Sequence, residues 1–404
     1  MSDKKRKVPK LRFPGFTDAW EQRKLGEVVT FFAGLTYSPD NVQSSGTLVL
    51  RSSNVKNGEI VDADNVYVNH NVVNSDNVQV GDIIVVVRNG SRDLIGKHAQ
   101  VKKQMEDTVI GAFMTGIRTK KPEFMNAMLD TSRFEAEVAK NLGATINQIT
   151  GRMFSEMSFS MPETKEQAVI GTFFRNLDSL ISLHQRKLDN VKMLKKSLLQ
   201  KLFPKDGEKT PELRFPGFTD AWEQRKLGDE FQKVNERNDG SFGREHWISV
   251  AKMYFQEPEK VQSNNIDTRT YVMREGDIAF EGHPNSEFKF GRFVANDIGS
   301  GVVSELFPIY RHKCQYDNKY WKYAIQLERI MAPIFAKSIT SSGNSSNKLE
   351  PSHFLRQSMS VATYEEQKVI GDFLNKFESL LSLHQRKLDH LKELKKGLLQ
   401  QMFV

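Results

Sequence analysis

The sequence has little of two features that define whole classes of protein: cysteine and long hydrophobic runs. Its only cysteine, Cys314, cannot form a disulfide within the chain, and no CxxC or HExxH motif suggests a zinc site. The longest apolar run, residues 83–87, is far shorter than the ~20 residues that span a bilayer, and the N-terminal residues lack a secretory hydrophobic segment. We therefore expect a soluble, cytoplasmic protein.

The sequence also lacks the motifs of enzymes that act on nucleotides. No two prolines are adjacent, so there is no Asp- or Asn-Pro-Pro-aromatic motif of the kind that holds the amino group of a flipped adenine. Gly299 and Gly301 form a lone GxG without a strand-to-helix context, and no Walker A sequence occurs. We therefore expect a non-catalytic chain that binds no cofactor and no metal.

The composition favours a folded protein with a polyanionic partner. With 404 residues, 38% of them hydrophobic, the chain can build about two domains of ~100 to 200 residues each. Its formal net charge is +8. Lys and Arg gain free energy by displacing counterions from phosphates, so this charge favours a partner such as nucleic acid.

An internal repeat is the strongest feature of the sequence. Residues 11–26, LRFPGFTDAWEQRKLG, recur letter for letter at residues 213–228, and residues 166–189 closely match residues 366–389. The period of about 200 residues is far longer than the roughly 20 to 50 residues of a solenoid repeat. The chain therefore contains two copies of a whole domain-plus-helix unit.

Between these matched segments the two halves diverge but keep a few anchors. Gly81-Asp82-Ile83 aligns with Gly276-Asp277-Ile278, and Gly96 aligns with Gly291. Residues 143–149 align with residues 343–349, which brings Asn147 and Asn347 into register. This pattern indicates one shared scaffold that carries two different surfaces.

Each copy is expected to fold as an α+β domain followed by a long helix. The variable segments alternate β-rich runs with turn signals, and the helical stretches 122–141 and 318–337 interrupt them. The predicted division of the chain is an N-terminal tail with the first repeated segment (1–27), a first variable domain (28–165), a first helix (166–206), a linker with the second repeated segment (207–229), a second variable domain (230–363) and a second helix (364–404).

The two long helices carry a heptad seam with spacings of three and four residues. Its polar members fix either the register or the choice of partner, or they lie at a seam edge open to water. The seam positions are Leu177, Ile181, His184, Leu188, Val191, Lys195, Leu198 and Leu202 in the first helix, and Phe377, Leu381, His384, Leu388, Leu391, Lys395, Leu398 and Met402 in the second.

Chain connectivity requires the paired helices to run antiparallel if the two domains are to stay apart. We expect a dumbbell with pseudo-twofold-related halves. A helix over residues 166–203 is ~57 Å long and leaves a spacer of roughly 40 Å, which corresponds to about 12 base pairs of DNA. Two unlike domains at this spacing would read a bipartite, asymmetric target on double-stranded DNA.

The repeated LRFPGF segments, the paired helices with LHQRKLD and the two divergent domains resemble the specificity subunit of type I restriction-modification systems over essentially the whole chain. The resemblance implies two target-recognition domains separated by two long antiparallel coiled-coil helices. It also implies docking to two methyltransferase subunits, which modify adenine N6 with S-adenosylmethionine. Two motor-nuclease subunits that use ATP and Mg would complete the restriction enzyme.

The candidate DNA-binding residues are the guanidinium, amide, ammonium, imidazole and hydroxyl side chains on predicted turns, since Arg matches guanine and Asn or Gln matches adenine in the major groove. In the first domain they are Arg51, Asn54, Lys56, Arg88, Asn89, Ser91, Arg92, Thr145, Asn147 and Gln148. In the second they are Arg244, His246, Lys252, His283, Asn285, Ser286, Lys289, Ser345, Asn347 and Lys348. Each of them can also be an ordinary solvated loop residue.

Two other functions remain open at the level of sequence. A divergent methyltransferase would bind S-adenosylmethionine by itself, and a structural coiled-coil protein would bind only other proteins. The duplicated but divergent domains favour a DNA-binding subunit over both.

Overall fold

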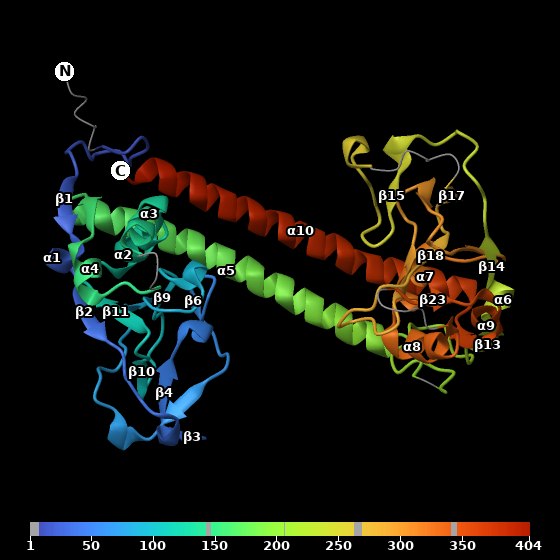
Figure 1. The fold of residues 1–404 in the computed structure, drawn as a ribbon, viewed down its shortest axis with the longest axis horizontal. Coiled ribbons are helices and arrows are strands. Elements are labelled where there is room, and N and C mark those ends of the chain that lie inside the picture. Colours follow the sequence, from blue (N-terminus) through green and yellow to red (C-terminus); the bar gives the residue numbers. More distant parts are fainter. Residues whose placement is uncertain (1–7, 143–146, 206, 262–268, 341–345) are drawn as a thin grey trace. The chain divides into compact units, whose positions relative to one another are not determined.

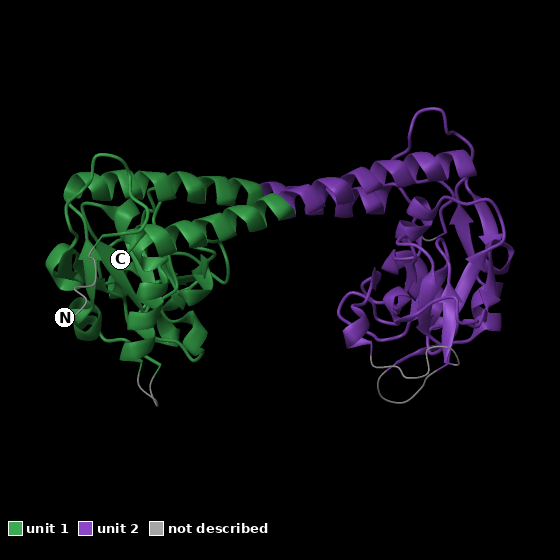
Figure 2. Cartoon of the chain, turned by 90° about the horizontal axis from the view of Figure 1, so that it is seen from above, with its two compact units in different colours: residues 1–185, 386–404 green, residues 186–385 purple. Residues whose placement is uncertain are grey.

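The computed structural model describes residues 8–142, 147–205, 207–261, 269–340 and 346–404. The chain divides into two compact units, coloured separately in Figure 2. Unit 1 consists of residues 1–185 and 386–404, and unit 2 consists of residues 186–385. Each unit therefore contains one variable domain together with parts of both long helices.

Unit 1 contains two four-stranded sheets, and several of their strands are labelled in Figure 1. The central sheet is antiparallel and has the order β2-β11-β8-β9, with all four residues of β8 buried. Its strands are β2 (Thr30–Ala33), β8 (Ile83–Val86), β9 (His98–Gln100) and β11 (Met114–Arg118). The other sheet, β10-β4-β7-β3, consists of β3 (Val42–Gln43), β4 (Thr47–Leu50), β7 (Val66–Val68) and β10 (Thr108–Ile110), and β5 (Val55–Lys56) pairs with β6 (Glu59–Ile60).

Unit 2 repeats the central sheet with the same order of strands, β14-β21-β18-β19. These strands are β14 (Phe231–Val234), β18 (Ile278–Glu281), β19 (Arg292–Ala295) and β21 (Ile309–His312). Among the described residues of unit 2, three two-stranded sheets accompany them, besides the one formed by the repeated segment: β15 (Ile248–Ser249) with β16 (Tyr254–Phe255), β17 (Thr270–Met273) with β20 (Gly301–Ser304), and β22 (Ile339–Thr340) with β23 (Lys348–Leu349).

The aligned Gly-Asp-Ile anchors form the same turn in both units. Gly81 has φ +98° and Gly276 has φ +87°, a left-handed conformation that glycine adopts without strain. The carboxylate that follows each glycine is buried and binds an arginine of the neighbouring strand through two hydrogen bonds. Asp82 accepts from Arg118 at 2.8 and 2.7 Å, and Asp277 accepts from Arg311 at 2.8 and 2.8 Å. The shared scaffold predicted from the sequence is therefore present.

Short helices cover the central sheet of each unit. They are α1 (Leu25–Val28), α2 (Pro122–Leu129), α3 (Ser132–Asn141) and α4 (Gly151–Glu156) in unit 1, and α6 (Leu227–Glu230), α7 (Asn318–Ala324), α8 (Glu328–Ala336) and α9 (Pro351–Arg356) in unit 2. Each predicted helical stretch is thus two helices. In unit 1 the break occurs at Thr131, whose hydroxyl accepts a hydrogen bond from the Phe134 N–H at 3.3 Å and starts a new helix.

The identical repeated segments tie each domain to the start of its long helix. Both carboxylate oxygens of Glu166 accept hydrogen bonds from Arg12 at 2.7 Å, and those of Glu366 accept from Arg214 at 2.8 Å. Both glutamates are completely buried. Next to these pairs, β1 (Glu21–Lys24) pairs with β12 (Ser158–Met161), and β13 (Glu223–Lys226) pairs with β24 (Ser358–Val361).

The long helices are α5 (Thr164–Lys201) and α10 (Tyr364–Met402), and they pair antiparallel within each unit. In unit 1, Phe174 lies 6.0 Å from Phe403 between ring centroids, and Asp178 binds Lys395. In unit 2, Lys195 binds Glu378. All sixteen predicted seam positions are buried or half-buried, so the heptad prediction is confirmed.

Candidate nucleic-acid interface

Three of the predicted loop segments in unit 1 lie together. The Asn89 amide donates to the Ser52 hydroxyl at 3.1 Å, which joins the loop after β4 to the loop after β8. The Asn147 amide donates to the Gly90 carbonyl at 3.1 Å, which adds the segment before α4. We refer to residues 51–54, 88–92 and 147–149 as loop cluster 1.

Loop cluster 1 presents cations and amides side by side. Arg88, Ser91 and Arg92 are exposed, and Asn89, Asn147 and Gln148 are half-buried. The Arg88 guanidinium carbon lies 5.0 Å from the centroid of the exposed Phe113 ring. A guanidinium fork beside amides is the combination that recognises guanine and adenine edges.

Asn54 has a structural role inside this cluster and is removed from the candidate DNA-binding residues. The residue is completely buried, and its amide donates to the carbonyl of Ala63 at 2.8 Å and to the side chain of Asn65 at 2.9 Å. Its side-chain oxygen accepts from the backbone N–H of Arg51 at 2.9 Å. Arg51 itself binds Asp64 at 2.7 Å, so part of its donor capacity is used within the domain.

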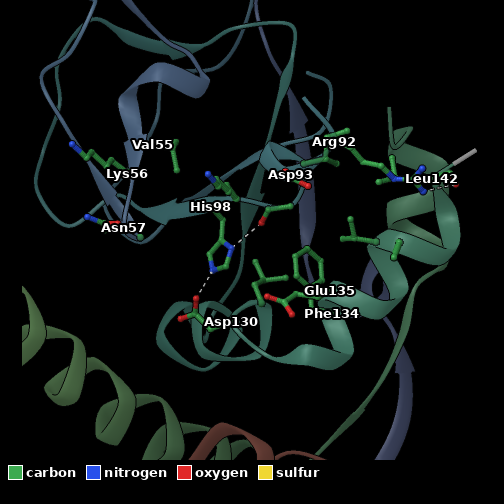
Figure 3. Close-up of a pocket in the computed structure, with 17 residues that line it drawn as sticks. Val55, Lys56, Asn57, Arg92, Asp93, His98, Asp130, Phe134, Glu135 and Leu142 are labelled. Carbon is green, nitrogen blue, oxygen red and sulfur yellow. Dashed lines mark hydrogen bonds and ion pairs between the residues drawn. The ribbon is translucent and has the colours of Figure 1, made fainter. Parts of the chain in front are cut away.

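Lys56 and Arg92 line a pocket of about 840 Å³, shown in Figure 3. His98 and Asp130 also line it, and Nε2 of His98 lies 3.4 Å from the Asp130 carboxylate. Burial alone would lower the pKa of His98, but the hydrogen bond and charge of Asp130 raise it. Because Asp93 and Glu135 also line the pocket, its charges are mixed and give no clear attraction for a phosphate.

The predicted segments of unit 2 also lie together. The backbone N–H of Asn347 donates to the Gly282 carbonyl at 2.8 Å, which joins the segment before α9 to the loop after β18. Arg292 donates to the Ala251 carbonyl at 2.6 Å, and its guanidinium carbon lies 5.1 Å from the Phe288 ring centroid. These contacts bring the segment around Lys252 to the same place. We refer to residues 244–252, 282–291 and 346–348 as loop cluster 2.

Most of the candidates in loop cluster 2 are available to a ligand. The exposed ones are Arg244, Lys252, His283, Asn285, Ser286, Lys289 and Lys348, while His246 and Asn347 are half-buried. Asn285 also shapes its own loop, because its side-chain oxygen accepts from the backbone N–H groups of Glu287 and Phe288 at 2.9 Å. His283 lies against Glu281 at 2.6 Å.

Two candidates, Thr145 and Ser345, lie outside the described residues.

The candidates predicted from the sequence do not include apolar side chains, because only side chains that form hydrogen bonds to bases were considered. Phe113 and Leu306 are exposed to 53% and 83% on the turns before β11 and β21, respectively. A large apolar residue in a segment rich in turn residues is the signal that would have identified them.

The described residues thus form two copies of one scaffold, each with its own cluster of polar loops. Residues 17–193 match the family described as type I restriction modification DNA specificity domain. The match covers less than half of the chain, and it confirms the resemblance to type I specificity subunits.

The known proteins that are similar to this chain come from type I restriction-modification systems. The chain is 24% identical over 222 residues to the type I restriction enzyme StySPI specificity subunit of Salmonella potsdam, a match that covers 52% of this chain and 48% of that subunit. The match thus spans about half the length of this relative.

The fold resembles that of the type I restriction-modification S subunit from M. genitalium, with TM-score 0.58 at 14% identity over 98% of this chain and 99% of that one. A chain from a structure on complex assembly and conformational transition of the type I R-M system gives TM-score 0.51 at 15% identity, over 96% of this chain and 98% of that one. Among the described residues, no helix combines the length and apolar character that a membrane span requires.

Proposed function

We propose that this protein is the specificity subunit of a type I restriction-modification complex and that it recognises a bipartite, asymmetric DNA target in the cytoplasm. Loop cluster 1 and loop cluster 2 would each read one half-site. The chain itself would be non-catalytic. Adenine methylation and restriction would be carried out by two methyltransferase and two motor-nuclease subunits that use S-adenosylmethionine, ATP and Mg.

The observation that carries this proposal is the assembly of each loop cluster from segments far apart in the sequence. In unit 1 the segments come from around residues 51, 88 and 147, and in unit 2 from around residues 250, 283 and 347. The central sheets have the same order of strands, but the side chains of the two clusters differ. Two different readers on one scaffold imply two different half-sites.

The long helices support a role as spacer. Each is a single uninterrupted helix of 38 or 39 residues, and each runs from one unit into the other. A helix of this length is ~57 Å long, which is on the order of one to two turns of DNA. We propose that the helices set the gap between the half-sites.

The outer faces of these helices support the docking of partner subunits. Six exposed leucines occur as three repeat-related pairs, in addition to the seam residues that pack within the pair: Leu180 and Leu380, Leu183 and Leu383, and Leu194 and Leu394. Clustered exposed apolar side chains favour a protein partner over solvent. We propose that helices of the methyltransferase subunits cover them.

The proposal is tested by mapping methylated adenines across a genome that carries this subunit with its partner subunits. The expected result is a single asymmetric motif with two defined blocks separated by a fixed number of undefined base pairs. Deleting this chain should abolish the methylation. A contiguous motif, or methylation that persists without this chain, would contradict the proposal.

A further inference from the structure

Two equivalent β-turns carry large apolar side chains at their tips. In unit 1 the turn of residues 111–114 connects β10 to β11, and the Met114 N–H donates to the Gly111 carbonyl at 2.8 Å. In unit 2 the turn of residues 304–307 connects β20 to β21 and is closed by a backbone hydrogen bond of 3.1 Å between its first and last residues. The third residue of each turn is Phe113 or Leu306, exposed to 53% and 83%.

In unit 1 the tip lies beside loop cluster 1. The backbone carbonyl of Phe113 accepts hydrogen bonds from the backbone N–H groups of Val87 at 3.0 Å and Arg88 at 3.2 Å. These residues continue β8 into the loop that holds Asn89 and contacts Asn147. Phe113 therefore stands among the side chains proposed to read bases, with the Arg88 guanidinium over its ring.

In unit 2 the strand register gives Leu306 the equivalent position. Ile278 of β18 pairs with Tyr310 of β21, and the backbone N–H of Phe280 donates to the Pro308 carbonyl at 2.9 Å. Leu306 lies two residues before Pro308, and Gly282, which binds Asn347 in loop cluster 2, lies two residues after Phe280, so this backbone contact brings the tip near the cluster. The tip therefore stands beside the polar candidates in this unit too.

The fold itself does not require apolar residues at these two positions. Turns favour Gly, Asn, Asp and Ser, whereas a Phe or Leu at the tip leaves apolar surface in water at a cost of roughly 25 cal/mol per Å². The variable domains differ at most positions, yet both keep a large apolar residue here. The cationic and amide neighbours of both tips favour a ligand that combines phosphates with an apolar group.

We infer that Phe113 and Leu306 are apolar base readers, each contacting the C5 methyl group of a thymine in the major groove of its own half-site. This inference rests on the proposed function. The thymine methyl is the apolar group that a base pair displays in the major groove, and it distinguishes thymine from cytosine without any hydrogen bond. The polar residues beside each tip would read the neighbouring bases.

The test uses the complete methyltransferase complex and duplexes that contain the mapped target. Each thymine is replaced in turn by deoxyuridine, which removes only the methyl group, and Kd is measured by fluorescence anisotropy. In each half-site one replacement should weaken binding by the wild-type complex about threefold to fivefold, the equivalent of one buried methyl group. Phe113→Ala should remove the sensitivity in one half-site, and Leu306→Ala should remove it in the other.

Val80→Ala is the matched control, because Val80 is 57% exposed near the opposite end of β8. It should leave Kd and the deoxyuridine effects unchanged, and thermal melts should show that all variants remain folded. The inference is overturned if the alanine variants keep the wild-type deoxyuridine pattern, or if they lose affinity equally for target and unrelated duplexes. If the wild-type complex does not prefer its target at all, the proposed function fails instead.

Discussion

Lys395 of α10 donates to the carboxylate of Asp178 of α5 at 2.5 Å, across the antiparallel helix pair of unit 1. The same ammonium donates to Asp130, between α2 and α3, at 2.6 Å. One side chain near the C-terminus thus connects both long helices to the first domain. In unit 2 the repeat-related Lys195 binds Glu378 and lies 5.0 Å from the Tyr323 ring centroid. The polar seam residues therefore favour the register interpretation over an open seam edge.

Removing Lys395 should destabilise the protein more than removing Lys195. Lys395→Met leaves the half-buried Asp178 carboxylate without its cation and Asp130 with His98 alone, which should cost about 2 kcal/mol of unfolding free energy. Lys195→Met is the matched control, and it should cost about 1 kcal/mol, because Glu378 is 38% exposed and can be solvated. Urea unfolding monitored by circular dichroism measures the loss of unfolding free energy in both variants. Equal losses would contradict the bridging role of Lys395.

Stability should decrease as the pH rises through the raised folded-state pKa of His98. Burial alone would lower its pKa, but Asp130 and the Gly96 carbonyl raise it above the ordinary value despite the opposing charge of Lys395. Protonated His98 therefore contributes stability that is fully present below the unfolded-state pKa of about 6.5 and is lost as pH rises through the raised folded-state pKa. His98→Gln should flatten this part of the Tm profile between pH 5.5 and 8.5. An unchanged slope would refute the assignment.

The scaffold was predictable from the sequence, because its determinants are local or repeated. The heptad spacing predicts the buried seam, and Gly81 and Gly276 mark the same turn because only glycine adopts this φ without strain. The pairing of distant strands was not predictable. β10 pairs in parallel with β4, whereas β20 pairs antiparallel with β17, and this difference depends on packing across each domain.

The candidate site was only partly predictable, because burial decides the role of a polar loop residue. Asn54 and Asn89 have the same side chain and lie in similar turn-rich segments. The first is fully buried and supports its loop, whereas the second is half-buried at the surface. Phe113 was not among the predicted candidates, because only polar side chains were considered. Burial and exposure at loops are set by tertiary contacts, which one sequence does not display.

Arg88 should contribute to specificity and not only to affinity. A bidentate guanidinium contact with guanine discriminates against other bases by about 1 to 3 kcal/mol, so Arg88→Ala should weaken target binding by roughly 10-fold to 100-fold and relax one position of the motif. Arg88→Lys should keep the charge but lose the discrimination. Lys120→Ala, an exposed cation beyond the opposite end of β11, is the control and should leave the motif unchanged. Anisotropy on a panel of duplexes measures these effects.

Exchanging one variable domain should change one half-site. Replacing residues 28–164 with the corresponding domain of another specificity subunit leaves loop cluster 2 and the repeated segments in place. Methylation mapping should then show one new half-site and one unchanged half-site, with the same gap. Arg12 and Glu166 both lie outside the exchanged segment, so their ion pair stays intact. A change in both half-sites would show that the two readers are not independent.

Lengthening both long helices should widen the gap between the half-sites without changing the bases that are read. Four residues inserted after Gln185 in α5 and four after Gln385 in α10 add ~6 Å to each helix, which corresponds to about one or two base pairs. The insertions lie at the border between the units, outside the residues of both loop clusters. Inserting into α10 alone is the control, because it shifts one seam against the other and should lower Tm instead of producing a new gap. If both insertions together leave the gap unchanged in methylation mapping, the helices do not set it.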